Sequence, residues 1–325
     1  MEWWIILLIV VGAVICLMFA LAAFTFKVAF ARMDKNPCLK YFSADDFGLT
    51  AKKVSAKDGE LTLNGYIYRN ERIPARKELV IFQHGMGPGQ AAYTTEIAYF
   101  CGLGYTVLAL DIRGCELSEG RGAKGIYSGV NCVKAAIDFA KCDEQLKNKK
   151  IYLVGHSWGG YSVLCASAER KVDKVVAISA PFTPVSTLYN GAAKIIGAPL
   201  AFLMRPFWYI INFFKFGAKG NANPAKCIQK SGTPAMLVHG DNDNIVAIKR
   251  SAYAKAKGEN VKKYLAQNKS HNPYNTIEAQ KLLIELNEKL STFNKNKDYF
   301  SSFDFNAATQ EDEKVMCDIA DFLED

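Results

Sequence analysis

The 325-residue sequence lacks the signals of several protein classes. Half of its residues are hydrophobic, which excludes intrinsic disorder, because disordered chains have low hydrophobicity. Lysine and arginine together number 40 against 32 acidic residues, but they are spread along the chain without a nucleic-acid-binding motif, so we expect no nucleic-acid partner. The nine cysteines have no metal-type spacing, and no dinucleotide-binding glycine signature occurs. The sequence therefore predicts neither a metal nor a cofactor.

One long segment, from Trp3 to Phe24, contains no charge. As a helix it spans about 33 Å, enough to cross a hydrocarbon core of roughly 30 Å. Trp3 and Trp4 lie where an interfacial aromatic belt is expected. We therefore predict a transmembrane anchor over residues 1–30, which attaches the remainder of the chain, residues 31–325, to a membrane.

A cleaved signal peptide and a buried core helix are the alternatives for this segment. Ala20-Leu21-Ala22 resembles a cleavage site. However, Glu2 is the only charged side chain before the apolar run, and the run is longer than the roughly 7–15 residues of a signal-peptide core. These two features favour an uncleaved anchor.

Basic residues follow the apolar run on its C-terminal side only, at Lys27, Arg32, Lys35 and Lys40. The positive-inside rule then places the bulk of the chain in the cytoplasm. The scattered cysteines fit a reducing compartment, where they would be free thiols.

Beyond the anchor, apolar strands alternate with segments of helical spacing. The predicted strands are 61–69, 79–82, 106–110, 151–154, 175–178, 236–238 and 262–266. The predicted helices are 90–101, 127–142, 158–169 and 311–323. This alternation predicts a mainly parallel sheet with helices on both faces, whose ligand-binding groups gather at the carboxyl ends of the strands.

The segment 182–225 interrupts this alternation with a long, apolar and aromatic stretch that contains Pro184, Pro199 and Pro206. So long a connection usually has a functional reason, and we interpret it as an inserted helical lid over the sheet. Two ordinary core helices are the alternative.

The sharpest motif is Gly155-His156-Ser157-Trp158-Gly159, which follows a predicted strand and opens a predicted helix. In this context G-x-S-x-G is typical of a nucleophile elbow, in which a strained turn lifts the serine hydroxyl into the open and glycines let the neighbouring chains approach. The turn also places the Trp158 N–H at a helix N-terminus, where it can stabilise an oxyanion. We therefore predict Ser157 as the nucleophile; an idle serine in a glycine-rich turn is the alternative.

A serine nucleophile needs a base, and the chain has four histidines. His84 and His239 end strands, and His156 is expected to point elsewhere on the turn, so these three are interpreted as structural. His271 lies in a loop just after the last predicted strand, where a general base would be presented. Elimination therefore selects His271, although a single loop histidine is more often simply solvated.

The third member of a triad is an acid that orients the imidazole. The loop after the strand 236–238 offers Asp241 and Asp243. Asp243 lies further along the loop and is better placed to reach His271, whereas Asp241 is interpreted as a turn residue bonded to its own backbone. A second oxyanion donor is expected from the glycine-rich loop after the strand 79–82, with the Met86 N–H as the candidate.

These features together resemble an α/β-hydrolase. The elbow, the His84-Gly85 loop, the acid loop at Asp243 and the base His271 occur in the order of that family, and the resemblance covers about residues 45–290. Among subgroups, the chain is similar to membrane-anchored hydrolases of the serine aminopeptidase or monoglyceride-lipase type.

The segment Asp111-Ile112-Arg113-Gly114 also matches the family's turn after the fourth strand. By this resemblance, Asp111 and Arg113 hold loops together. Members of the family often have a second glycine where this chain has Cys115-Glu116, which is a departure that affects the shape of the loop.

The resemblance implies a serine hydrolase that works through an acyl-enzyme, without a cofactor. An anchored domain with an apolar lid favours a lipid or another long-chain acyl ester as the substrate. A peptidase or amidase, an acyltransferase, and a non-catalytic membrane-tethered binding module on a hydrolase fold remain alternatives, because fold alone does not determine function.

Overall fold

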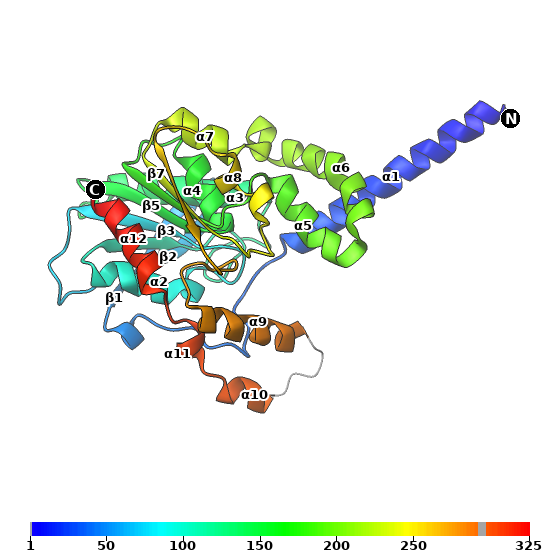
Figure 1. The fold of residues 1–325 in the computed structure, drawn as a ribbon. Coiled ribbons are helices and arrows are strands. Elements are labelled where there is room, and N and C mark those ends of the chain that lie inside the picture. Colours follow the sequence, from blue (N-terminus) through cyan, green and yellow to red (C-terminus); the bar gives the residue numbers. More distant parts are fainter. Residues whose placement is uncertain (1, 292–296) are drawn as a thin grey trace.

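The computed structural model describes residues 2–291 and 297–325. An eight-stranded sheet forms the centre of the described residues, with helices around it (Figure 1). The strands are β1 (Thr50–Asp58), β2 (Leu61–Arg69), β3 (Glu78–Gln83), β4 (Thr106–Leu110), β5 (Lys150–His156), β6 (Lys174–Ile178), β7 (Ala235–Gly240) and β8 (Val261–Ala266). The helices are α1 (Trp3–Ala29), α2 (Thr94–Gly102), α3 (Tyr127–Cys142), α4 (Trp158–Ala166), α5 (Pro184–Ile196), α6 (Ala198–Phe216), α7 (Pro224–Ser231), α8 (Ala252–Lys255), α9 (Ile277–Ser291), α10 (Lys297–Ser302), α11 (Phe305–Ala308) and α12 (Glu313–Glu324).

The strand order in the sheet is β1-β2-β4-β3-β5-β6-β7-β8. β2 runs antiparallel to both β1 and β4, and all other neighbours are parallel. The central strands β3 to β7 are almost fully buried, as expected for strands with helices on both faces. The predicted mainly parallel sheet is therefore confirmed.

Two apolar clusters, one on each face of the sheet, make up the core. One cluster includes side chains of α3, α4 and α7, such as Val133, Leu164 and Ile228. The other includes side chains of α2 and α12, such as Phe100 and Ile319. The prediction of helices on both faces is confirmed.

The edge strand β1 was not predicted from the sequence. Only Val54 and Ala56 of this strand are buried, and its lysines are exposed. A strand that buries two small side chains carries too little apolar periodicity to be detected from the sequence.

Helix α1 projects from the body of the protein, with its N-terminus at the far end (Figure 1). It is the one helix in the described part of the chain that is long and apolar enough to cross a membrane, a property that signal sequences share. Its last turns contact the domain: Ala22 and Phe26 are buried, and the Trp208 indole N–H donates to the Thr25 hydroxyl at 3.2 Å. The ring of Phe30, just after α1, lies 5.9 Å from the ring of Trp158.

The segment after α1 is hydrogen-bonded to the domain. The Met33 N–H donates to the Gly114 carbonyl at 2.9 Å, and the Arg32 guanidinium donates to the carbonyls of Ser118 and Gly120 at 3.1 and 3.0 Å. These contacts hold the C-terminal end of α1 in a fixed position against the loop that follows β4.

Helices α5 and α6 occupy the connection between β6 and β7 and lie beside α1 (Figure 1). Pro184 begins α5, where its missing N–H costs nothing, and Thr183 and Ser186 form a capping box at this end. The predicted insertion 182–225 thus consists of these two helices, a short 3₁₀ turn and the first residues of α7.

Candidate active site

Ser157 lies between β5 and α4 with φ 55° and ψ −114°, a conformation that is strained for a residue with a side chain. A Cβ atom at Gly159 would lie 1.9 Å from the Gln83 carbonyl oxygen, and one at Gly155 would lie 2.5 Å from the Gly159 carbonyl oxygen. Only glycine fits at either position. The tight turn is therefore held in place by close packing of β5 and α4 with the end of β3.

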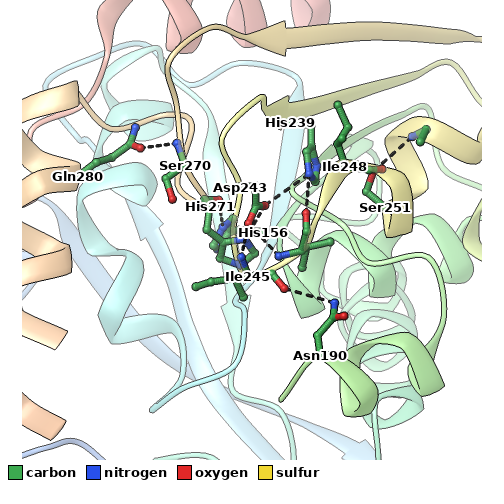
Figure 2. A network of polar contacts seen from close by, with 12 residues as sticks. His156, Asn190, His239, Asp243, Ile245, Ile248, Ser251, Ser270, His271 and Gln280 are labelled. Atoms are coloured by element: carbon green, nitrogen blue, oxygen red, sulfur yellow. Dashed lines mark hydrogen bonds and ion pairs between the residues drawn. The ribbon is translucent and has the colours of Figure 1, made fainter. Parts of the chain in front are cut away.

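The imidazole of His271 is paired with Asp243. Its Nδ1 lies 2.8 Å from Asp243 Oδ2, and the Asp243 side chain is completely buried (Figure 2). The other carboxylate oxygen, Oδ1, accepts hydrogen bonds from the N–H groups of Ile245 and Val246 at 2.9 and 2.8 Å. Burial alone would raise the pKa of Asp243, but the hydrogen bond from His271 and these further contacts hold that pKa below its ordinary value. Asp243 is therefore ionised at neutral pH, and His271 Nδ1 carries the shared proton.

His239 contacts the same carboxylate. Its Nε2 lies 3.5 Å from Asp243 Oδ2 and 2.9 Å from the Val246 carbonyl, to which it donates. Burial lowers the pKa of His239 and keeps this imidazole neutral. His239, predicted from the sequence to be structural, thus supports the position of Asp243.

Asp241 lies on the same loop, but the structure does not place it against His271. Its Oδ1 accepts from the Lys269 N–H at 3.1 Å. The expectation that Asp241 bonds its own backbone was wrong, because Lys269 belongs to the neighbouring loop that carries His271. Asp241 joins the two loops.

His156 has a larger part in the site than the sequence suggests. Its Nε2 lies 3.0 Å from the His271 carbonyl oxygen, to which it must donate. Its Nδ1 then accepts from the Tyr93 hydroxyl at 2.9 Å, and that hydroxyl in turn accepts from the Gly85 N–H at 3.0 Å. Burial lowers the pKa of His156 to about 3, so the ring stays neutral. This chain of hydrogen bonds links the loop after β3 to the loop of His271.

The backbone N–H groups of Met86 and Trp158 donate no hydrogen bond within residues 2–291 and 297–325, and Met86 lines the same cavity as Ser157. Trp158 begins α4, where the first N–H groups of a helix have no intrahelical partner and carry partial positive charge. Met86 follows Gly85, at which a Cβ would lie 3.3 Å from the Ser157 Cβ. The loop after β3 therefore lies directly against the elbow.

His84 holds this loop in place. Its Nδ1 donates to the Gly85 carbonyl at 2.7 Å, and its Nε2 accepts from the Ile112 N–H at 3.0 Å. Burial lowers the pKa of His84 to about 4, so it stays neutral and keeps both bonds at physiological pH.

Ser157, His271 and Met86 line a single cavity of about 400 Å³. The Ser157 hydroxyl makes no hydrogen bond within the described residues, and its residue is partly exposed. Leu283 and Asn287 of α9 form another wall of this cavity. These two residues could not be predicted from the sequence, because an ordinary amphipathic helix gives no signal of which cavity it borders.

A family model described as the alpha/beta hydrolase fold matches residues 78–197, from the start of β3 to the residue after α5. The chain has the α/β-hydrolase fold. An esterase of Pyrococcus furiosus aligns with a TM-score of 0.59 and 20% identity, over 80% of this chain and 96% of that one. An alpha/beta hydrolase of a Penicillium species aligns with a TM-score of 0.50 and 20% identity, over 78% and 98%. A search of curated protein sequences finds no match.

The loop after β4 of this α/β-hydrolase fold is organised by Asp111. Its Oδ1 accepts from the Gln90 N–H at 2.7 Å and its Oδ2 from the Leu117 N–H at 3.1 Å, so it does join two loops. Arg113, which was expected to hold loops together as Asp111 does, has no hydrogen-bond partner at its Nε in the described residues. In the pair Cys115-Glu116, which differs from the resembled family, Glu116 adopts φ 32°, so the loop has a left-handed residue at this point.

The described residues contain no group of three or more His, Cys, Asp or Glu side chains that could hold a metal ion. The cavity that Ser157 borders is also lined by His271, whose imidazole is paired with Asp243, and by Met86 of the loop after β3. Such an arrangement can move a proton and stabilise a developing negative charge.

Proposed function

We propose that the protein is a membrane-anchored serine hydrolase that cleaves carboxylic esters, with Ser157 as nucleophile, His271 as general base and Asp243 as the acid that orients it. One observation carries this proposal: the unbonded hydroxyl of Ser157, on a strained turn, borders the same cavity as an imidazole that is hydrogen-bonded to a buried carboxylate. The structural similarity to an esterase of Pyrococcus furiosus supports an ester as the substrate.

In the first half of the reaction, the Ser157 oxygen attacks the carbonyl carbon while His271 Nε2 takes the hydroxyl proton. The Met86 and Trp158 N–H groups donate to the oxyanion of the tetrahedral intermediate, where each donor contributes about 10²–10³ in kcat. Asp243 stabilises the imidazolium. The bond from carbon to the alcohol oxygen then breaks, and His271 gives its proton to the leaving alcohol.

In the second half, a water molecule attacks the acyl-enzyme and gives its proton to His271. The bond between the acyl carbon and Ser157 breaks, the carboxylic acid leaves, and the serine hydroxyl is restored. Atoms and protons balance over the cycle without any cofactor.

We assign residues 1–30 to a retained membrane anchor and residues 31–325 to the hydrolase domain. The burial of Ala22 and Phe26 against the domain supports retention of α1. The apolar surface of the inserted helices beside α1, where Ile195 and Phe214 are 85% and 79% exposed, supports a lid over residues 182–225 that rests on a membrane, and a lipid or long-chain acyl ester as the substrate. Lys27 and the basic residues after it support a cytoplasmic domain.

A fluorophosphonate probe tests this function. The wild-type protein should be labelled at one residue, and Ser157→Ala should not be labelled. Ser270→Ala, in the loop of His271, is the matched control and should label like wild type. Absence of labelling in a folded wild-type protein, together with no hydrolysis of p-nitrophenyl esters, would favour a non-catalytic binding module instead.

A further inference from the structure

A second cavity, also of about 400 Å³, lies between α1, α5 and α6. Its walls are almost entirely apolar, with Phe24 and Val28 from α1, Leu188 and Ile195 from α5, and Trp208 from α6. Two threonines also border it. The Thr25 hydroxyl donates to carbonyls of its own helix and accepts from the Trp208 indole, and the Thr187 hydroxyl donates to the Thr183 carbonyl. The cavity therefore offers a ligand no unpaired polar group on these walls and suits a hydrocarbon chain.

Met86 connects this apolar cavity to the catalytic one. Among the described residues it is the one that borders both cavities, and it is 46% exposed. Because the Met86 N–H is the proposed oxyanion donor, an ester carbonyl held there stands between the two spaces. The catalytic cavity has polar side chains on its other walls, among them Asn272 and Asn287.

We propose that the apolar cavity between α1 and α5 binds the acyl chain of the substrate, so that the N-terminal helix is a wall of the substrate site as well as a membrane anchor. This inference rests on the proposed function and names its substrate class, which is an ester of a long-chain fatty acid. The polar alcohol of the ester occupies the catalytic cavity beside α9.

The volume of the cavity fits a long chain. An apolar cavity of about 150 Å³ holds a benzene molecule, with six carbons, so a cavity of about 400 Å³ holds roughly sixteen carbons by proportion. An acetyl group would leave most of this apolar surface uncovered. The cavity therefore favours long acyl chains over short ones.

The position of the cavity explains how such a chain could arrive. Phe24 and Ile195 at its rim are 64% and 85% exposed, and both belong to surfaces that would meet the bilayer if α1 spans it. The bonds of Arg32 and Met33 to the domain keep this wall in place. A lipid can then slide its chain between α1 and α5 without crossing water.

Chain-length kinetics on the full-length protein in detergent micelles tests the inference. Val28→Trp and Ala192→Trp place bulk in the cavity, and Val14→Trp puts the same side chain on α1 away from it. Excluding about two methylenes from the cavity should lower the ratio of kcat/KM for p-nitrophenyl palmitate to that for p-nitrophenyl butyrate about tenfold. Val14→Trp should leave this ratio as in wild type. An equal ratio in all four proteins would overturn the inference.

A binding measurement separates this inference from the proposed function. Ser157→Ala is incubated with a palmitate ester that carries a photoreactive group at the end of its chain, and the adduct is mapped by mass spectrometry. Crosslinks at Leu188 that Val28→Trp abolishes support the cavity, even if wild type hydrolyses no ester and the proposed function fails. Ester hydrolysis by wild type with no crosslink at Leu188 would reject the cavity and leave the proposed function intact.

Discussion

Replacing Asp243 by asparagine should move the proton of the neutral His271 imidazole from Nδ1 to Nε2. The amide oxygen can take the place of Oδ1 and accept from the N–H groups of Ile245 and Val246, which leaves the amide NH₂ facing His271 Nδ1. Two donors cannot bond, so the imidazole must adopt the tautomer that carries its proton on Nε2. That nitrogen can then no longer accept the proton of Ser157. The opposite amide orientation would leave two backbone N–H groups against a donor and is less favourable.

The expected loss in kcat/KM for a p-nitrophenyl ester is about 10⁴-fold, the loss caused by the same replacement in a serine protease triad. Asp241→Asn is the matched control on the same loop, since an amide oxygen accepts from the Lys269 N–H as well as a carboxylate does. It should retain activity within about twofold of wild type. Thermal unfolding would show that both variants fold. The account of the triad is refuted if Asp243→Asn keeps activity within tenfold of wild type, or if Asp241→Asn loses as much.

Two further predictions concern stability. Gly159→Ala should lower the free energy of unfolding by about 3 kcal/mol, because the new Cβ would meet the Gln83 carbonyl oxygen. Gly102→Ala is the control, and it should lower the free energy of unfolding by less than about 1 kcal/mol because the space at its Cβ is open. Equal melting temperatures of the two variants would contradict this. Burial raises the pKa of Glu96 to about 7 and that of Glu311 to about 9, so both carboxyls bind protons more tightly in the folded state. The stability that these two protonated carboxyls contribute is present below pH 4.5 and is lost as pH rises through 7 to 9. Glu311→Gln should therefore reduce the fall in melting temperature between pH 5 and pH 9. An equal fall in wild type and in Glu311→Gln would contradict this prediction.

The elbow could be predicted because its signals are local. A buried strand, glycines at fixed offsets and a following helix all lie within residues 151–169, and the structure contains each of them. The helix 127–142 likewise begins and ends where its apolar spacing predicts. The α/β-hydrolase fold followed from these local patterns in their order along the chain.

Contacts between distant loops could not be predicted in the same way. His156 reaches the backbone of His271, 115 positions further along the chain, and nothing near His156 indicates that partner. The wall that Leu283 and Asn287 give the catalytic cavity depends on how α9 docks. His271 could be selected by elimination among the four histidines, and Asp243 by its place in the loop after β7. Neither prediction required knowledge of a contact between loops, and the structure places His271 Nδ1 2.8 Å from Asp243 Oδ2.

Helix α1 shows another limit of sequence reasoning. Its apolar length indicates a membrane segment and gives no hint that its last turns pack on the domain. The contact of Phe30 with Trp158, the residue after the proposed nucleophile, arises only in three dimensions. The same packing places Phe24 and Val28 on the wall of the apolar cavity that we propose as the acyl-chain site.

The central claim is that His271 activates the hydroxyl of Ser157. The rate constant for fluorophosphonate labelling of Ser157, measured in wild type and in His271→Ala at pH 7, tests it most directly. We predict that the variant is labelled at least about 10³-fold more slowly while its melting temperature shows that it is folded. Labelling of Ser157 at the same rate in both proteins would contradict the claim.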